Sequence, residues 1–332
     1  MTPMRRARRI YALTLVLLLP FAAPASALAQ AGGTEAYPSR PVRLIVPFAA
    51  GGGTDIAARL VAAKLHDAWQ QTVIVENRPG GLGTVASEYV ARQPADGLTL
   101  LIGVPGTHAI AQYLYPKLGY DPVRDFAGIT MLLYSPFVWL VNPAQPYRTL
   151  AELIEHSKSE PVSYGSPGAG SLQHIFGEMI NLQYGSRLEH VPYRGVAPAM
   201  QDVVGNHIPA AFGEIGSARS LIESGQLRAL AITGKARDPA APAIPTFGEA
   251  GFPGFDYGGW FALFAPAATP KPIVDKIAAE VTRIVRGPEI SARLMDEGWE
   301  VGGGTPEEFT KFWLTSAEEL GKVIKLRNIK LE

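Results

Sequence analysis

The stretch that decides the fold is VRLIVPFAAGGGTD, residues 42–55. Its apolar run at 42–46 is typical of a β-strand that is buried on both faces. Three glycines follow, and Asp55 is then placed to cap a helix. The helix is indicated by apolar residues at steps of four, four and three: Ala57, Val61, Leu65 and Ala68. A strand, a glycine-rich turn and a helix form the repeating unit of a parallel α/β sheet.

The same unit recurs along most of the chain. Further strands are expected at 73–75, 98–102, 162–165, 188–191, 208–212, 227–232 and 260–264. Further helices are expected around 172–180, 196–204, 273–284 and 309–324. The stretch 238–255 is rich in proline and glycine and should be a loop. Repeated strand–helix units of this length predict parallel sheets with crossover helices.

The order of these units predicts two lobes. One series fills residues 36–140, a second fills 141–259, and the chain then returns to the first lobe over 260–332. The expected fold class is therefore α/β, with two lobes joined by a hinge and a ligand cleft between them. A chain that crosses twice between lobes suits closure around a ligand.

The first residues predict export. Arginines form a basic segment, an apolar run follows at 10–23, and Ala27-Leu28-Ala29 ends it with a small-residue cleavage pattern. The run is too short to span a membrane comfortably and contains Pro20. We expect residues 1–29 to be a signal peptide that is cleaved near Ala29, which places the mature protein in the periplasm; a retained signal anchor is the alternative.

The amino-acid composition argues against several classes of function. The chain has no cysteine, so it offers neither a lipid-modified cysteine nor a thiolate metal site. Without residues 1–29 it has 26 basic and 30 acidic residues, a formal charge of −4. This balance gives no basic face for nucleic acid. We expect a soluble protein without cofactor or lipid anchor, and a monomer.

Five loops share one design in which a strand ends, small residues follow and a helix begins. They are residues 47–55, 77–84, 103–108, 165–174 and 193–196. Glycine permits close approach of a ligand, and the unpaired N–H groups of a helix's first turn attract an anion. Each loop could also be only a tight connection. Several of them in both lobes predict a ligand site at the carboxyl ends of the strands.

Known motifs for nucleotides, hydrolysis and metals are missing. No lysine follows the glycines at 51–53 as a P-loop requires, and their spacing is not that of a dinucleotide fingerprint. Neither Ser166 nor Ser171 lies in a G-x-S-x-G elbow. The histidines form no H-E-x-x-H motif. Enzymatic function is therefore not expected.

Individual polar residues keep two interpretations each. Asp55 is most simply a helix N-cap, although it could accept an ammonium group or a hydroxyl. His174 could meet a ligand or only support its loop. Arg194 could pair with a carboxylate or stack on Tyr193 at the surface. Glu214 could accept a ligand amine or hydrogen-bond within the hinge.

Other side chains could recognise the rest of a ligand. Hydroxyls and backbone donors converge where Ser166 and Ser171 flank two glycines, and this favours ligand contact. The aromatic residues Phe48, Tyr257 and Trp260 could stack on a ring, so an aromatic acid is an open alternative.

Read in order, these loops resemble the tripartite tricarboxylate transporter substrate-binding receptors, also called the Bug family. The resemblance rests on residues 37–38 with 42–55, Glu76-Asn77-Arg78, Ala95-Asp96-Gly97, 164–174, Val191-Pro192-Tyr193-Arg194-Gly195, 245–255, 260–270 and 328–332. It covers essentially the whole mature chain. It implies a type II-like periplasmic-binding-protein fold that closes on a small carboxylate, without catalysis.

The resemblance also implies which residues contact the ligand. In the first lobe they are Phe48, Gly51, Gly52, Asp55 and Thr107. In the second lobe they are Ser166, Gly168, Gly170, Ser171, His174, Gly195 and Glu214. Three positions depart from the family pattern: Ala50 replaces a frequent proline, Pro167 a frequent serine and Glu214 the usual aspartate. The last two should change ligand choice, because lost donors to a buried carboxylate cost about 1–3 kcal/mol each.

Two functions remain open at this point. The first is a receptor for a mono-, di- or tricarboxylate, or an acidic amino acid, that serves the permease subunits of a tripartite tricarboxylate transporter. The second is a sensor with the same pocket that reports a carboxylate or an aromatic acid to a signalling partner.

Overall fold

A computed structural model describes residues 37–193, 195–256 and 258–330. The predicted signal peptide, Arg194 and Tyr257 lie outside the described residues. The strands form two sheets, one of six strands and one of five. No helix in the described ranges has both the length and the apolar character needed to cross a membrane.

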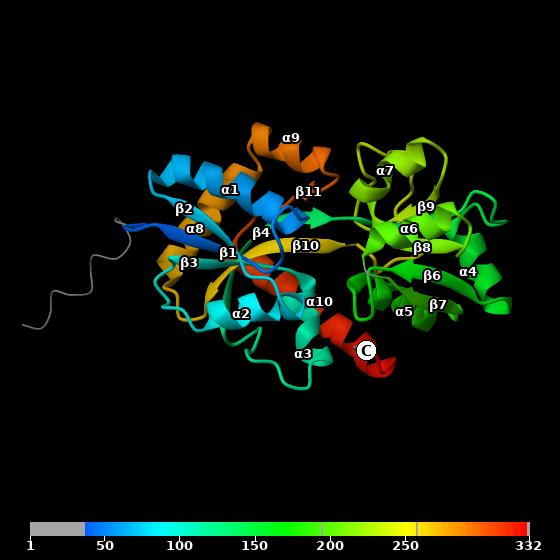
Figure 1. Cartoon of the computed structure of the whole chain (residues 1–332), viewed down its shortest axis with the longest axis horizontal. Helices are drawn as coiled ribbons and strands as arrows, with labels where there is room; N and C mark the ends of the chain where they lie inside the picture. Colours follow the sequence, from blue (N-terminus) through cyan, green and yellow to red (C-terminus); the bar gives the residue numbers. More distant parts are fainter. Residues whose placement is uncertain (1–36, 194, 257, 331–332) are drawn as a thin grey trace, which may run out of the picture. The chain divides into compact units, whose positions relative to one another are not determined.

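The first sheet has the strand order β11-β4-β10-β3-β1-β2. Its strands are β1 (Val42–Val46), β2 (Val73–Asn77), β3 (Thr99–Gly103), β4 (Phe126–Ser135), β10 (Gly259–Pro266) and β11 (Glu300–Val301). Its helices are α1 (Gly53–Trp69), α2 (Thr84–Ala91), α3 (Ala111–Leu114), α8 (Lys271–Val285), α9 (Pro288–Asp296) and α10 (Pro306–Leu326). Two short turns are η1 (Gly81–Gly83) and η2 (Gly106–Ile110). Figure 1 shows α1, α8 and α9 on one side of this sheet and α2, α3 and α10 on the other.

The second sheet has the order β7-β6-β8-β5-β9. Its strands are β5 (Phe137–Val141), β6 (Val162–Ser166), β7 (Leu188–Pro192), β8 (Ala210–Glu214) and β9 (Arg228–Ile232). Its helices are α4 (Leu150–Ser159), α5 (Leu172–Tyr184), α6 (Val196–Val204) and α7 (Ile215–Glu223). Residues of α6 and α7 pack on one face of this sheet, and residues of α4 and α5 pack on the other.

The expectation of parallel sheets holds for β1 with β2 and β3 and for β6 with β7 and β8, but each sheet also contains antiparallel pairs. In the first sheet β10 runs antiparallel to β3 and β4, and in the second β5 runs antiparallel to β8 and β9. The reason is the path of the chain. It passes from one sheet to the other between β4 and β5 and returns between β9 and β10, so β10 enters the first sheet from the opposite end. The lobe boundaries at 140/141 and 259/260 stay a prediction.

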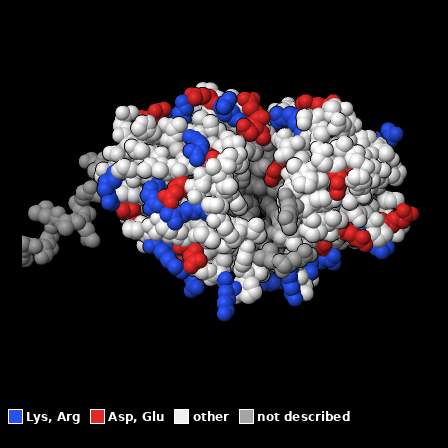
Figure 2. All heavy atoms as spheres, in the orientation of Figure 1, with Lys and Arg blue, Asp and Glu red and all other residues white. Residues whose placement is uncertain are grey.

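The lobes also touch away from the crossings. Arg327, at the end of α10, forms an ion pair with Glu178 of α5. Gly216, in the first turn of α7, faces the turn that follows α9: a side-chain carbon at Gly216 would lie 2.3 Å from the carbonyl oxygen of Glu297. These contacts leave the loops at the strand ends as the open part between the lobes, where Figure 2 shows the surface hollowed.

Candidate functional site

The loops predicted to bind the ligand follow strands that end level with one another. In the first sheet Val46 of β1 pairs with Asn77 of β2, and in the second Ser166 of β6 pairs with Pro192 of β7. All four are the last residues of parallel strands, so the loops that follow them gather at one edge of each sheet. In open α/β sheets this edge is where ligands bind.

Asp55 organises the glycine-rich loop of the first lobe. Helix α1 begins at Gly53 with Gly52 as its N-cap, so the prediction that Asp55 caps the helix is wrong. Asp55 is the third residue of the helix, and its carboxylate reaches back to accept the Gly51 N–H at 2.9 Å. It also accepts the Arg59 guanidinium at 2.9 Å and the Asn77 amide at 3.0 Å.

These three donors explain the electrostatics of Asp55. The Arg59 hydrogen bond is the largest influence, and with the Gly51 and Asn77 bonds it lowers the pKa of the Asp55 carboxyl to about 2. Asp55 is only 3% exposed. Its oxygens are therefore occupied inside the loop, where they hold Gly51 in place. The first N–H groups of α1 follow directly and have no partner within the helix.

Asn77 joins two of the predicted contact residues. Its amide nitrogen donates to the backbone oxygen of Phe48 at 3.0 Å as well as to Asp55. The loop that follows Asn77 then reaches Gly83, where a side-chain carbon would lie 2.7 Å from Thr107 and 3.1 Å from Pro47. Three loops of the first lobe therefore meet at this glycine.

Thr107 lies inside this junction. Its side chain is fully buried, its hydroxyl exchanges hydrogen bonds with the backbone of Val104, and it lies 2.8 Å from Nδ1 of His108. Burial lowers the pKa of His108 to about 3, so this imidazole is neutral. The Thr107 side chain is thus placed to support the loop.

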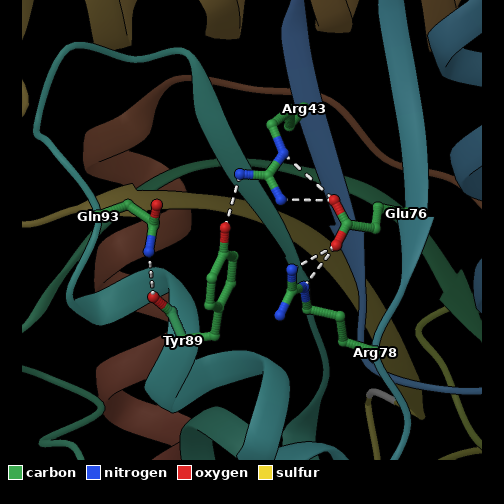
Figure 3. A network of polar contacts seen from close by, with 5 residues as sticks. All are labelled: Arg43, Glu76, Arg78, Tyr89 and Gln93. Carbon is green, nitrogen blue, oxygen red and sulfur yellow. Dashed lines mark hydrogen bonds and ion pairs between the residues drawn. The ribbon is translucent and has the colours of Figure 1, made fainter.

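A network of charged residues fixes the end of β2 (Figure 3). Glu76 accepts two hydrogen bonds from Arg43, at 2.5 and 3.2 Å, and one from Arg78 at 2.6 Å. Arg43 also donates to the Tyr89 hydroxyl at 2.6 Å, and the Arg78 guanidinium lies 3.7 Å from the centre of the Tyr89 ring. Because Glu76 and Arg78 flank Asn77, this network orients the residue that connects Phe48 with Asp55.

The matching loop of the second lobe is built on hydroxyls. Ser171 is the N-cap of α5 and accepts the backbone N–H of His174 at 3.2 Å. Ser166 is fully buried, and its hydroxyl lies 3.2 Å from that of Ser171 and accepts the Gly168 N–H at 3.2 Å. Gly170 donates to Nδ1 of His174 at 3.1 Å. The side chains of Ser166 and His174 thus stabilise the loop by hydrogen-bonding to its backbone.

His190 of β7 contacts this loop, although no sequence motif indicated it. Its Nε2 lies 2.5 Å from the Ser166 hydroxyl, and its ring stacks on that of His174 at 3.7 Å with 7° between the planes. Burial, and then the proximity of His174, lowers the pKa of His190 to about 3. The neutral imidazole can therefore accept a hydrogen bond from the Ser166 hydroxyl. Ser166 and His190 are separated along the chain and meet only because β6 and β7 pair side by side.

The two remaining predicted residues begin helices. Gly195 is the N-cap of α6 and has a φ of 109°, which favours glycine, and its N–H donates to the backbone oxygen of Pro167 at 3.3 Å. Glu214 is the last residue of β8 and the N-cap of α7, but its side chain bonds to no N–H of that helix. Its carboxylate forms no hydrogen bond or ion pair with any residue that the structure describes.

The aromatic residues differ from those expected. Trp260 is 0% exposed and packs in the first lobe against Phe309, so the prediction that it could stack on a ligand is wrong. Its neighbour Phe261 is half-buried instead and meets Trp299 edge to face at 5.8 Å. A side-chain carbon at Gly53 would lie 3.0 Å from the Trp299 ring. The two rings therefore border the N-terminus of α1.

The arrangement is suited to binding an anion. Helices α1 and α5 each begin at the gathered loops, and their first N–H groups and dipoles favour negative charge. No group of three or more His, Asp or Glu side chains within the described ranges is arranged to hold a metal ion. The chemistry on offer is backbone and hydroxyl hydrogen bonding.

Comparison with known proteins agrees with this geometry. The family model described as "Tripartite tricarboxylate transporter family receptor" matches residues 57–329. Rpa4515 of R. palustris, solved with adipate, is 34% identical with a TM-score of 0.75, over 89% of this chain and 100% of that one. MatC of Rhodopseudomonas palustris, solved with bound malate, is 33% identical with a TM-score of 0.71, over 87% and 100%.

A third structure, the periplasmic binding protein BugD, is 32% identical with a TM-score of 0.71, over 89% of this chain and 100% of that one. These similarities confirm the resemblance drawn from the sequence and the predicted fold class, two α/β lobes of the periplasmic-binding-protein type.

Proposed function

The chain belongs to the tripartite tricarboxylate transporter family of receptors, and we propose that it captures a small carboxylate in the periplasm and passes it to a membrane permease. The observation that carries the proposal is a pair of loops, one in each lobe, that each end at a helix N-terminus. The first precedes α1 and is held by Asp55, and the second precedes α5 and is held by Ser166. Related proteins were solved with adipate and with malate, which are both carboxylates.

In this proposal the predicted site residues divide into two groups. Contacts to the carboxylate come from the Gly52 N–H and the Ser171 hydroxyl. Gly168 and Gly195, whose N–H groups are bonded within the second lobe, let the ligand approach the backbone closely. Phe48 adds its ring at the edge of the first loop. The other predicted residues hold these loops in shape through the hydrogen bonds described above: Gly51, Asp55 and Thr107 in the first lobe, and Ser166, Gly170 and His174 in the second.

The same contacts support binding without catalysis. Ser166 and His190 form the nearest approach to a nucleophile with a base, but Ser166 is 0% exposed and a substrate could not reach its hydroxyl. We therefore propose that the protein binds its ligand without altering it chemically. We also propose that it acts as a monomer. Periplasmic location fits the basic and apolar start of the chain and the related periplasmic protein BugD.

A thermal-shift screen of the purified mature protein against mono-, di- and tricarboxylates tests the proposal. At least one acid should raise the unfolding midpoint, and Gly52→Asp should abolish that rise because a carboxylate then occupies the anion's place. Gly248→Asp is a matched control, since Gly248 is also exposed and has no positive φ. If no acid in a broad panel raises the midpoint of the wild-type protein, the proposal is wrong.

Measuring ligand uptake by cells distinguishes a transport receptor from a sensor that uses the same pocket. Cells that lack the gene should lose uptake of the labelled ligand if the protein serves a permease. Unchanged uptake together with a lost transcriptional response would identify a sensor.

A further inference from the structure

His190, Ser166 and Ser171 form a chain of side chains within hydrogen-bonding distance of one another. Ser166 is fully buried at the end of β6, and its hydroxyl lies 2.5 Å from Nε2 of His190 and 3.2 Å from the hydroxyl of Ser171. Ser171 is half-buried and is the N-cap of α5, where the proposed function places the ligand carboxylate. The chain therefore leads from His190 to the proposed binding position.

The number of partners around Ser166 restricts the direction of its proton. A hydroxyl donates one hydrogen bond and accepts two. The Gly168 N–H donates to Ser166 at 3.2 Å and occupies one acceptor position. If His190 donates as well, both acceptor positions are filled. The Ser166 proton then points to Ser171 or to the Gly168 carbonyl oxygen, each 3.2 Å away.

The same count at Ser171 shows what a bound carboxylate selects. Ser171 already accepts the backbone N–H of His174 at 3.2 Å. A hydrogen bond from Ser166 fills its second acceptor position, so its own proton is free to point at the ligand. A carboxylate accepts hydrogen bonds and donates none, and it therefore favours this direction of the chain. Hydrogen bonds that run in one direction strengthen one another.

The His190 ring is held in the position that this chain requires. It stacks on the His174 ring at 3.7 Å with 7° between the planes, and its centre lies 5.5 Å from that of the Tyr164 ring. Burial, and then the proximity of His174, lowers the pKa of His190 to about 3. Either nitrogen of a neutral imidazole can carry the proton. A shift of the proton to Nε2 therefore makes His190 a donor to Ser166 without any change in charge.

We propose that His190 is a positioning residue for the ligand: its Nε2–H donates to Ser166, Ser166 donates to Ser171, and Ser171 donates to the ligand carboxylate. This inference rests on the proposed function, because it assumes that a carboxylate binds at the N-terminus of α5. It adds a residue that does not touch the ligand but strengthens the hydrogen bond from Ser171.

Two variants of His190 test the inference in calorimetric titration with the acid that binds the wild-type protein most tightly. His190→Phe keeps a flat ring against His174 but forms no hydrogen bond, and it should weaken binding about fivefold to tenfold. His190→Gln keeps an N–H group within reach of Ser166 and should restore most of the affinity. His66→Phe, which changes an exposed histidine of the first lobe, is the control and should bind as the wild type does.

Two further measurements separate positioning from a loss of structure. Ser166→Ala interrupts the chain, so adding His190→Phe to this variant should weaken binding by no more than about twofold. Nitrogen NMR of protein labelled at histidine shows which ring nitrogen carries the proton, and in the complex this should be Nε2 of His190. Thermal unfolding without ligand checks that each variant is folded.

The outcomes separate this inference from the proposed function. Wild-type affinity in His190→Phe would overturn the inference, as would an unprotonated Nε2 in the complex. An equal loss of affinity on adding His190→Phe to Ser166→Ala would overturn it too, because His190 would then act by another route. Failure of every acid to bind the wild-type protein would instead refute the proposed function itself.

Discussion

Replacement of Asp55 by asparagine should destabilise the protein by removing the negative charge in the first turn of α1 that holds the preceding loop. In the wild-type protein the Asp55 carboxylate accepts hydrogen bonds from Gly51 and Arg59 at 2.9 Å and from Asn77 at 3.0 Å. The amide of asparagine is neutral, and its NH₂ group would face donors. The change keeps the size of the side chain, so its effect reports on charge and hydrogen bonding.

The magnitude follows from the carboxyl group's pKa, which is lowered from 3.8 to about 2. At about 1.36 kcal/mol for each pKa unit, this difference corresponds to roughly 2.4 kcal/mol. Arg59 is 54% exposed, and water screens its share of the interaction. We therefore expect Asp55→Asn to lower the free energy of unfolding by about 1–2 kcal/mol at neutral pH.

Urea unfolding at a series of pH values is the assay. Because the pKa of Asp55 is depressed in the folded state, its contribution is fully present above pH 3.8 and is lost as the pH falls towards 2. The gap between wild type and Asp55→Asn should therefore close on acidification. Asp67→Asn, an exposed acid on the same helix, is the control and should change little. A difference in stability that is absent at neutral pH, or that stays the same in acid, would show that the charge of Asp55 does not stabilise this loop.

Three further changes probe other contacts. Gly216→Val places a side chain against the Glu297 carbonyl and should weaken ligand binding by about 1–3 kcal/mol by holding the lobes apart; unchanged affinity in calorimetry would contradict the contact. Ser171→Ala removes the N-cap of α5 and should cost about 1 kcal/mol in urea unfolding together with most of the ligand-induced thermal shift; a full thermal shift would exclude the hydroxyl from the site. Glu76→Gln should cost about 0.5–1 kcal/mol, and less at high salt, because its arginine partners are partly exposed; a salt-independent loss would argue against the ion pairs.

Much of the fold was predictable because local patterns agree with it. The strand at Val42–Val46 and the helix at Val196–Val204 lie where apolar runs and periodicity place them. The sequence predicted a lobe boundary at 140/141, but the residue at which the chain passes from β4 to β5 was not predictable from it. The residues of this passage read as one apolar stretch around Pro136, and nothing local indicates that the chain changes sheets there.

The site was harder to predict for a related reason. Glycines and hydroxyls at strand ends marked the loops, but the residues that hold them come from neighbouring strands. Asn77 reaches Asp55 and His190 reaches Ser166 only through strand pairing, which no periodicity reveals. No pattern predicted Trp299 as a neighbour of the site. It follows a short helix in sequence and reaches the start of α1 only because the chain folds back at the turn that contacts Gly216.

The decisive measurement is a crystal structure of the protein with the acid that stabilises it most. The ligand carboxylate should lie within hydrogen-bonding distance of the first turn of α1 and of the loop from Gly168 to Ser171. A ligand that instead occupies the cavity of about 600 Å³ bordered by Tyr134, Thr233 and Glu300 would contradict this placement.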